Sequence, residues 1–330
     1  MKKIIVIITV CSMIFAMSFV ASAIDISNNT IPYNNEELDL SQYTVQDLIE
    51  MPVSELNNLI SEFERIYDPF GSYARRKAEN VVDIRYDINV ITPLWTSGEE
   101  KTNNYVEGGH DIITAKACAI LINDKGFFVE GELERLIATL SISLASSLPD
   151  EDESDTLTFK GHFYDPDTGK NWMGGTDDTA QSNAVEHFRN AYNAADEGDL
   201  VLMFEEIGRS LHYIQDANVP YHAANVIFGE DDGDHSQFEE YAFRYIYPYI
   251  DDLTTLASSN YTTVAAKTVA ALVKTAAQDA KERYPILRDN PDNQDEWDTV
   301  AEFCIRKSVK YSTVVLYKLA QKSQVTFYYN

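Results

Sequence analysis

The sequence predicts an all-α fold in which most of the chain forms one multi-helix domain. Glycine and proline are sparse, with 14 and 10 occurrences in 330 residues. Long segments repeat apolar residues at intervals of three and four, which is the spacing of one face of a helix. The alternation of apolar and polar residues that would indicate strands is rare. The expected helices cover residues 45–66, 109–123, 130–147, 178–195, 198–217, 235–258, 262–283 and 295–321.

Residues 1–23, MKKIIVIITVCSMIFAMSFVASA, have the pattern of a secretory signal peptide. Two lysines precede a long apolar run, which ends in small residues at 21–23. The run is just short of the length that spans a bilayer, so an uncleaved anchor is the alternative. No second run of this kind follows, and we therefore expect the mature chain to be soluble, secreted and extracellular.

Residues 24–94 differ in character from the rest of the chain. They are polar and Asn-rich at first, carry a short helix pair in VQDLIEMPVSELNNLISEFERIY, and are followed by Trp95 in DINVITPLW. Residues 95–330 are numerous enough to form a single domain with a sizeable core. The chain thus divides into a signal peptide, a small helical segment and one large domain.

Acidic residues outnumber basic residues by 53 to 26, which gives a formal net charge of −27. Binding to nucleic acid, or sustained docking on an anionic membrane, normally needs a basic surface, so neither is expected. A metal enzyme is less constrained, because bound cations bring their own positive charge.

Cys118 and Cys304 lie in helix-like apolar contexts, TAKACAILI and AEFCIRKSV. They are expected as two buried thiols or, given export, as one disulfide.

The segment SLHYIQDANVPYHAANV, residues 210–226, places His212 and Asp216 four residues apart near the end of a helix. At about 100° per residue, both side chains lie on the flank of the apolar stripe and can converge on one point. Pro220 ends this helix, and His222 follows in a turn. The apolar stripe consists of Leu200, Phe204, Ile207, Leu211 and Ile214.

The same spacing returns in HSQFEEY, where His235 and Glu239 are again four residues apart. One such pair is usually a surface hydrogen bond or ion pair. Imidazole nitrogen and carboxylate oxygen are also the ligands that zinc prefers. Because five of the six histidines fall into compact polar clusters, the sequence predicts a site for several zinc ions.

Three segments together, GHFYDPDTGKNW, LHYIQDANVPYHAANV and HSQFEEY, resemble the bacterial zinc-dependent phospholipases C. The resemblance covers about residues 95–330 and implies an all-helical domain that binds three zinc ions in a cleft. It also implies that the mature protein begins at a tryptophan, here Trp95, whose free amine binds zinc. Residues 24–94 would then be a pro-segment that is removed by cleavage after Leu94. The alternative is that Trp95 is a core aromatic residue.

The resemblance further implies which residues bind each zinc ion. The first ion takes Asp150 in LPDEDE, with Asp152 or Asp155 as alternatives, and three further ligands, His162, His212 and Asp216. The second ion takes His222, His235 and Glu239. The third takes His110, a bridging Asp216, and the amine and carbonyl of Trp95. His187 in AVEHFRNAY has no place in this pattern and is expected to be an ordinary helix residue.

The implied reaction is the hydrolysis of glycerophospholipids by a monomeric enzyme at a membrane or micelle surface. Its products are diacylglycerol and a phosphorylated head group. Zinc would lower the pKa of a bound water, and Asp150 would orient or deprotonate that water. The implied head-group contacts are Phe159, Glu151 and Glu99 or Glu100. Choline preference stays open, because Glu151 stands where related enzymes often have tyrosine and Glu99 is offset from their acidic residue.

Two other functions remain as alternatives. The fungal and plant single-strand nucleases share the fold and the three-zinc plan, but usually pair histidine with aspartate in the second-zinc segment, where this chain has Glu239. A secreted metal-binding or adhesion module with a decayed site would not need the whole ligand set, and every expected side-chain ligand is present. The sequence therefore favours the phospholipase.

Overall fold

The computed structural model describes residues 30–33, 36–67, 109–153, 159–227, 234–323 and 325–328. The predicted all-α class is confirmed, because helices form the core. The strands in these ranges are one short antiparallel hairpin of β1 (Thr30–Tyr33) and β2 (Glu36–Asp39). The signal peptide, the proposed cut after Leu94, Trp95 and Glu99 lie outside the described residues. No helix within the described ranges is long and apolar enough to cross a membrane.

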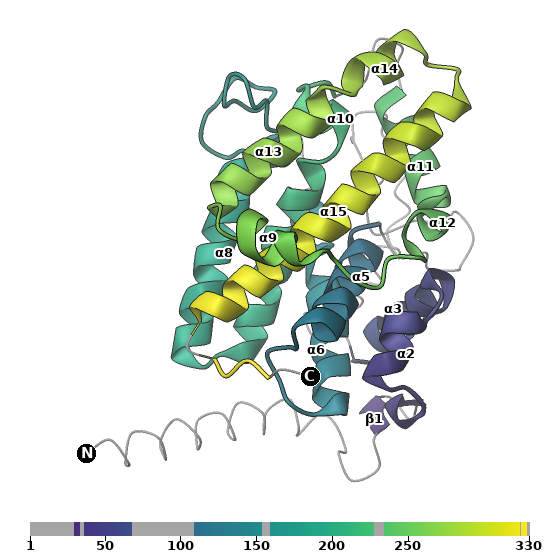
Figure 1. Ribbon diagram of the computed structural model, residues 1–330, viewed down its shortest axis with the longest axis vertical. Helices are drawn as coiled ribbons and strands as arrows, with labels where there is room; N and C mark the ends of the chain where they lie inside the picture. The colour runs from purple at the N-terminus through teal and green to yellow at the C-terminus, as the bar shows by residue number, and fades with distance from the viewer. Residues whose placement is uncertain are drawn as a thin grey trace.

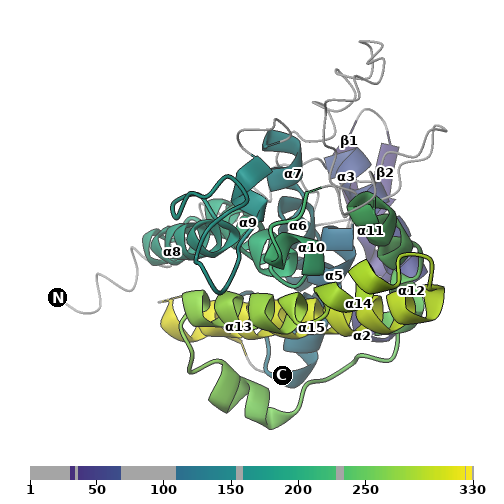
Figure 2. The ribbon, with the colours of Figure 1, turned by 90° about the horizontal axis from the view of Figure 1, so that it is seen from above.

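Long helices in two layers build the frame of the domain. In one layer α9 packs against both α8 and α6, and in the other α13 lies beside α15 (Figure 2). Helix α15 crosses α5 and α9 and so ties the layers together (Figure 1). The bounds are α5 (Gly109–Asp124), α6 (Glu132–Ala145), α8 (Ala180–Glu197), α9 (Leu200–Asp216), α13 (Val269–Lys281) and α15 (Gln294–Lys322).

Local sequence explains the close pairing of α8 and α9. Helix α8 ends at Gly198, whose φ of 79° lies in the left-handed region that favours glycine. The side chain of Asp199 then caps α9 by accepting the N–H of Leu202 at 3.0 Å. This short connection brings the two helices side by side, and α9 carries two of the expected metal ligands.

Two expected helices differ from the observed ones, and the segment 45–66 forms the helix pair that its sequence predicted. The segment 45–66 is divided into α2 (Val45–Glu50) and α3 (Val53–Tyr67), because Pro52 keeps the preceding residue, Met51, out of the helical region. The segment 235–258 forms α11 (Asp234–Arg244) and α12 (Ile246–Ile250), and residues 251–257 are not helical. The segment 262–283 begins as a π-helical turn, Asn260–Val264, before Thr268 caps α13.

Three short helices were not expected from periodicity, since a single turn is too short to show it. They are α7 (Leu148–Asp152), α10 (Pro220–Ala223) and α14 (Tyr284–Asp289), and each has proline in its first turn. Proline suits that position because its fixed φ is already helical. Two of these short helices, α7 and α10, carry expected metal ligands.

The two cysteines of the described chain are buried free thiols, one in α5 and one in α15. The disulfide alternative for Cys118 and Cys304 is therefore wrong for this structure. Burial raises the pKa of Cys304 to about 12 and raises that of Cys118 as well. Thiols with such high pKa values are unreactive near neutral pH.

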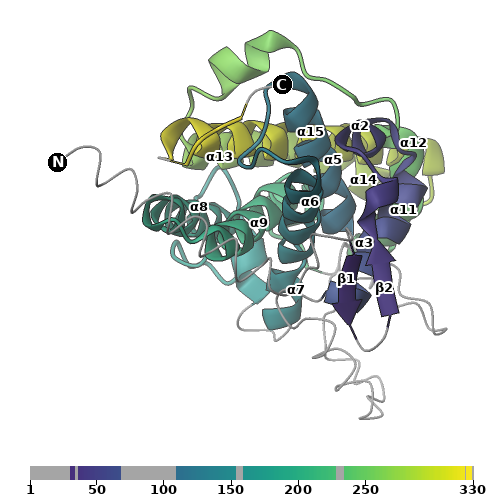
Figure 3. The same cartoon turned by 90° about the horizontal axis from the view of Figure 1, so that it is seen from below.

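The helix pair expected in residues 24–94 is present as α2 and α3. Both helices pack against α5 and α6, and α3 also contacts α12 and the β1–β2 hairpin. Figure 3 shows α2, α3 and the hairpin gathered along one side of the molecule, next to α5 and α6. The described part of this segment is thus continuous with the core of the large domain.

Gly208 allows the closest approach between α6 and α9. A Cβ atom at this position would lie 2.7 Å from the carbonyl oxygen of Ile142 and would also contact Ala145. Gly208→Ala is expected to lower the free energy of unfolding by about 1–3 kcal/mol, because the two helices must move apart. Denaturant unfolding measures this change. Leu202→Ala, at an exposed site on the same helix, is the control and should change stability by less than about 0.5 kcal/mol.

Candidate metal centre

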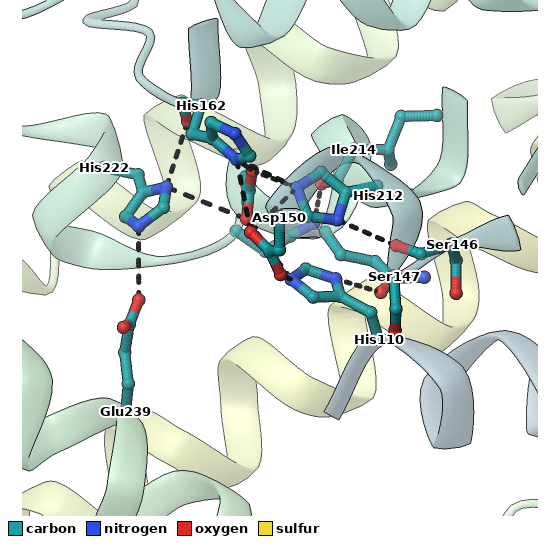
Figure 4. Close-up of polar contacts among 12 residues, drawn as sticks. His110, Ser146, Ser147, Asp150, His162, His212, Ile214, His222 and Glu239 are labelled. Carbon is teal, nitrogen blue, oxygen red and sulfur yellow. Dashed lines mark hydrogen bonds and ion pairs between the residues drawn. The ribbon is translucent and has the colours of Figure 1, made fainter. Parts of the chain in front are cut away.

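Six elements bring eight ionisable side chains into one buried cluster. The side chains come from the first turn of α5, from α7, from the 3-10 turn Phe159–His162, from the end of α9, from α10 and from α11. Each is at most 5% exposed. Figure 4 shows Asp150 surrounded by histidines, with Glu239 at the edge of the group beside His222. The eight are His110, Asp150, His162, His212, Asp216, His222, His235 and Glu239.

Asp216 is the carboxylate with the most histidine neighbours. Its Oδ2 lies 2.8 Å from His162 Nδ1 and 3.1 Å from His212 Nε2. Its Oδ1 lies 3.5 Å from His110 Nε2 and 3.8 Å from His222 Nδ1. The two oxygens therefore face different histidines, which is the arrangement that a bridging carboxylate needs.

A second group lies between α10 and α11. Glu239 Oε1 is 3.2 Å from His222 Nε2 and 3.0 Å from His235 Nε2. Although burial alone would raise the pKa of Glu239, the two histidines hold it well below its usual value. These three side chains converge closely enough to share one ion.

Two further groups of three surround His212. One consists of His162, His212 and Asp216, and the other of His110, Asp150 and His212. In each group the possible ligand atoms lie within 4.8 Å of one another. The described residues thus contain three buried groups that could hold metal ions.

Asp150 provides the clearest test of whether a cation fits this cluster. Both of its carboxylate oxygens are buried, and neither accepts a hydrogen bond from the described residues. The histidine nitrogens around it are 3.6–3.7 Å away, beyond normal hydrogen-bond length. Burial raises the pKa of Asp150 to about 7. Because a buried carboxylate without partners is costly, this position fits a cation, and imidazole and carboxylate ligands suit zinc.

Four of the five histidines are held in the same orientation. In each, Nδ1 contacts an oxygen outside the group of ligand atoms, which leaves Nε2 facing the cluster. The acceptors are Gln215 Oε1 for His110 at 2.7 Å, Ser146 O for His212 at 2.8 Å, His162 O for His222 at 3.0 Å and Ile227 O for His235 at 2.8 Å. Such bonds fix the tautomer and the ring plane of metal-binding histidines.

His162 is turned the other way, and its partner is a residue that the sequence did not reveal. Its Nε2 lies 3.4 Å from Glu153 Oε2, while Glu153 Oε1 accepts a hydrogen bond from Tyr213 at 2.5 Å. Burial would raise the pKa of Glu153, but these two contacts lower it. The acidic run LPDEDESD offered no signal to single out Glu153, because only the turn after α7 directs it toward His162.

Glu153→Gln is expected to weaken metal binding by about 10–100-fold, because it removes the charge that orients His162 while keeping an acceptor for Tyr213. Competition with a chelator measures this change. Asp152→Asn is the matched control, since Asp152 is exposed and pairs with Arg209 at 2.6 Å. Equal affinity in the two variants would show that Glu153 has no role in holding His162.

The other expected residues lie in different settings. Of the aspartates in LPDEDE, Asp150 lies within the cluster and Asp152 points away toward Arg209, while Asp155 lies outside the described residues. Phe159 is buried, with its ring centroid 5.0 Å from that of His162. Glu151 is half-buried on α7. His187 lies apart from the cluster and pairs with Glu206 at 2.8 Å.

Similarity to known proteins is a second source of evidence about the function of this cluster. No family model matches the chain. It is 26% identical over 235 residues to a phospholipase C of Clostridium perfringens, a match that covers 64% of this chain and 58% of that protein. It is 29% identical over 147 residues to a phospholipase C of Paraclostridium bifermentans, covering 41% of this chain and 37% of that protein. The chain thus spans less than two thirds of the length of these relatives.

Solved structures extend the comparison. The alpha toxin of Clostridium absonum superposes with a TM-score of 0.58 at 25% identity, over 69% of this chain and 66% of that one. The alpha-toxin of Clostridium perfringens from an avian strain gives a TM-score of 0.55 at 26% identity, over 66% of this chain and 64% of that one. The resemblance to the bacterial phospholipases C that the motifs indicated is confirmed.

Proposed function

We propose that this protein is a secreted zinc-dependent phospholipase C that hydrolyses glycerophospholipids to diacylglycerol and a phosphorylated head group. The observation that carries the proposal is the buried Asp150 carboxylate, which lacks hydrogen-bond partners among the described residues and is ringed by three histidines. The similarity to bacterial phospholipases C supports the same activity.

Three zinc ions would occupy the cluster. His162, His212, Asp216 and Asp150 would hold the first ion, and His222, His235 and Glu239 the second. His110 and Asp216 would hold the third together with the amine of Trp95. When bound, zinc supplies positive charge to the phosphoryl oxygens and lowers the pKa of a coordinated water.

Side chains of the protein carry out the other parts of the proposed hydrolysis. Asp150 orients the attacking water and accepts its proton, since neither of its oxygens accepts a hydrogen bond from the described residues. The water oxygen forms the new bond to phosphorus, and the bond from phosphorus to the glycerol oxygen breaks. The leaving oxygen takes the proton that Asp150 accepted from the water and departs as the hydroxyl of diacylglycerol. The oriented histidine rings keep the site in place throughout.

The proposal includes the processing and the surroundings of the enzyme. Residues 1–23 are the signal peptide, residues 24–94 the pro-segment and residues 95–330 the catalytic domain, which acts outside the cell as a monomer. Phe159, Glu151 and Glu99 contact the head group of a phospholipid in a membrane or micelle. The packing of the Phe159 ring beside His162 supports its place in this set.

Substrate assays test the proposed activity. Protein cleaved before Trp95 is incubated with phosphatidylcholine, with phosphatidylethanolamine and with single-stranded DNA, with and without a chelator. We expect diacylglycerol from a phospholipid and its loss with the chelator. Cleavage of DNA with no phospholipid turnover would establish the nuclease alternative, and no turnover of any substrate would support a non-catalytic metal-binding module.

A further inference from the structure

We infer that residues 38–67 are a permanent part of the folded protein and stay bound as a separate chain after the pro-segment is cut. The inference rests on the proposed function only for the natural cut after Leu94. The observation that supports it is the packing of α2 and α3 against the proposed catalytic domain. In the sequence, the two helices precede that cut and the catalytic domain follows it.

Apolar burial in this segment is as complete as in the centre of the domain. Five of its side chains are 0% exposed, and they lie at helical spacing along α2 and α3. They join both core clusters: Val53 packs in the one that contains Ile112 and Ile113, and the others pack in the one that contains Leu121 and Leu140. The five are Leu48, Val53, Leu56, Ile60 and Phe63.

The surface that α2 and α3 cover is formed by α5 and α6, which belong to the proposed mature domain. Helices α2 and α3 lie on α5 and α6 (Figure 1), and α5 carries His110 in its first turn. Departure of the segment would expose the apolar side chains of α5 and α6 that now pack against it. A soluble domain seldom exposes a continuous apolar patch of this kind.

A polar contact fixes the start of α3 to a distant part of the chain. The N–H of Val53 donates a hydrogen bond to Asp251 Oδ1 at 2.9 Å, across 198 residues of sequence. The first N–H groups of a helix have no partner within the helix, and a carboxylate there also suits the helix dipole. The N-terminus of α3 is thus capped by the large domain itself.

Cutting the chain beyond residue 67 removes none of these contacts. The cut changes only the effective concentration of the segment, which a covalent linker holds in the millimolar range. A segment whose apolar face is fully buried in two core clusters should stay bound at micromolar protein. Activation by cleavage would then act through the new amine at Trp95, with α2 and α3 still in place.

The test uses the full-length protein with a specific protease site inserted between Ala78 and Glu79, so that it needs neither the natural cut nor any activity. After cleavage, gel filtration at micromolar concentration separates bound from free fragments. We expect both fragments in one peak, with amides of α3 as well protected from hydrogen exchange as before the cut. A small fragment that elutes alone while the large fragment stays soluble, or loss of protection in α3, would overturn the inference.

Two variants sharpen the test. Phe63→Ala should weaken retention of the small fragment by about a hundredfold or more, because it removes a fully buried ring. Glu62→Ala, at an exposed neighbouring position on α3, should retain the fragment like the parent protein. If Phe63→Ala does not fold before the cut, hydrogen exchange in the parent protein still decides the question. A retained fragment in a protein that hydrolyses no phospholipid would contradict the proposed function alone.

Discussion

Asp216→Asn is expected to reduce phospholipid hydrolysis by at least about a thousandfold and to lower the metal content of the protein. Asp216 faces four histidines within 3.8 Å and directs one oxygen to each side of the cluster. Asparagine has a similar shape, but it carries no negative charge and its amide nitrogen has no free electron pair to donate to a metal. Loss of a preorganised charged group at a reacting centre has an effect of this size. Turnover of phosphatidylcholine and elemental analysis measure both changes.

His187→Ala is the control for this variant. His187 belongs to the same layer of helices, but its partner is Glu206 and none of the three groups that could hold a metal ion includes it. We expect activity and metal content close to those of the parent protein. His212→Ala should behave like Asp216→Asn, so equal losses in all three variants would contradict the assignment of the site.

One additional residue in front of Trp95 is expected to cost the protein one zinc ion and at least about a hundredfold in activity. A peptide nitrogen is neither basic nor free to coordinate, whereas a terminal amine is both. The two forms are prepared by cutting full-length protein at an inserted site, either directly before Trp95 or one residue earlier. Residues 38–67 are present in both forms, so a difference in packing of α2 and α3 cannot explain the result.

Uncut protein completes this comparison. It should be as inactive as the form with one additional residue, since its residue 95 lacks an amine as well. Full activity and full zinc content in the uncut protein would show that Trp95 is a core aromatic residue. In that case residues 24–94 would be a permanent domain that needs no processing.

The helical class and the local pairs of the site could be predicted from the sequence because both depend on short spacing. His212 and Asp216, and likewise His235 and Glu239, lie one helical turn apart, and the contacts of 3.1 and 3.0 Å follow from that geometry. The division of residues 45–66 at Pro52 into the expected helix pair is equally local.

Contacts between distant segments could not be predicted in this way. Gln215 and the carbonyl oxygen of Ser146 orient His110 and His212, and nothing in their neighbouring sequence marks them for that role. The choice between Asp150 and Asp152 depends on how the single turn of α7 is directed, with one side chain in the cluster and the other on Arg209. The partner of the buried face of α3 likewise depends on tertiary packing.

Elemental analysis of the protein that begins at Trp95 tests the central claim most directly. The three buried groups, and the Asp150 carboxylate that accepts no hydrogen bond from the described residues, lead us to expect close to three zinc ions per chain. Removal of the zinc with a chelator should abolish hydrolysis of phosphatidylcholine, and added zinc should restore it. Purified protein that contains no transition metal and still hydrolyses the phospholipid would contradict the account.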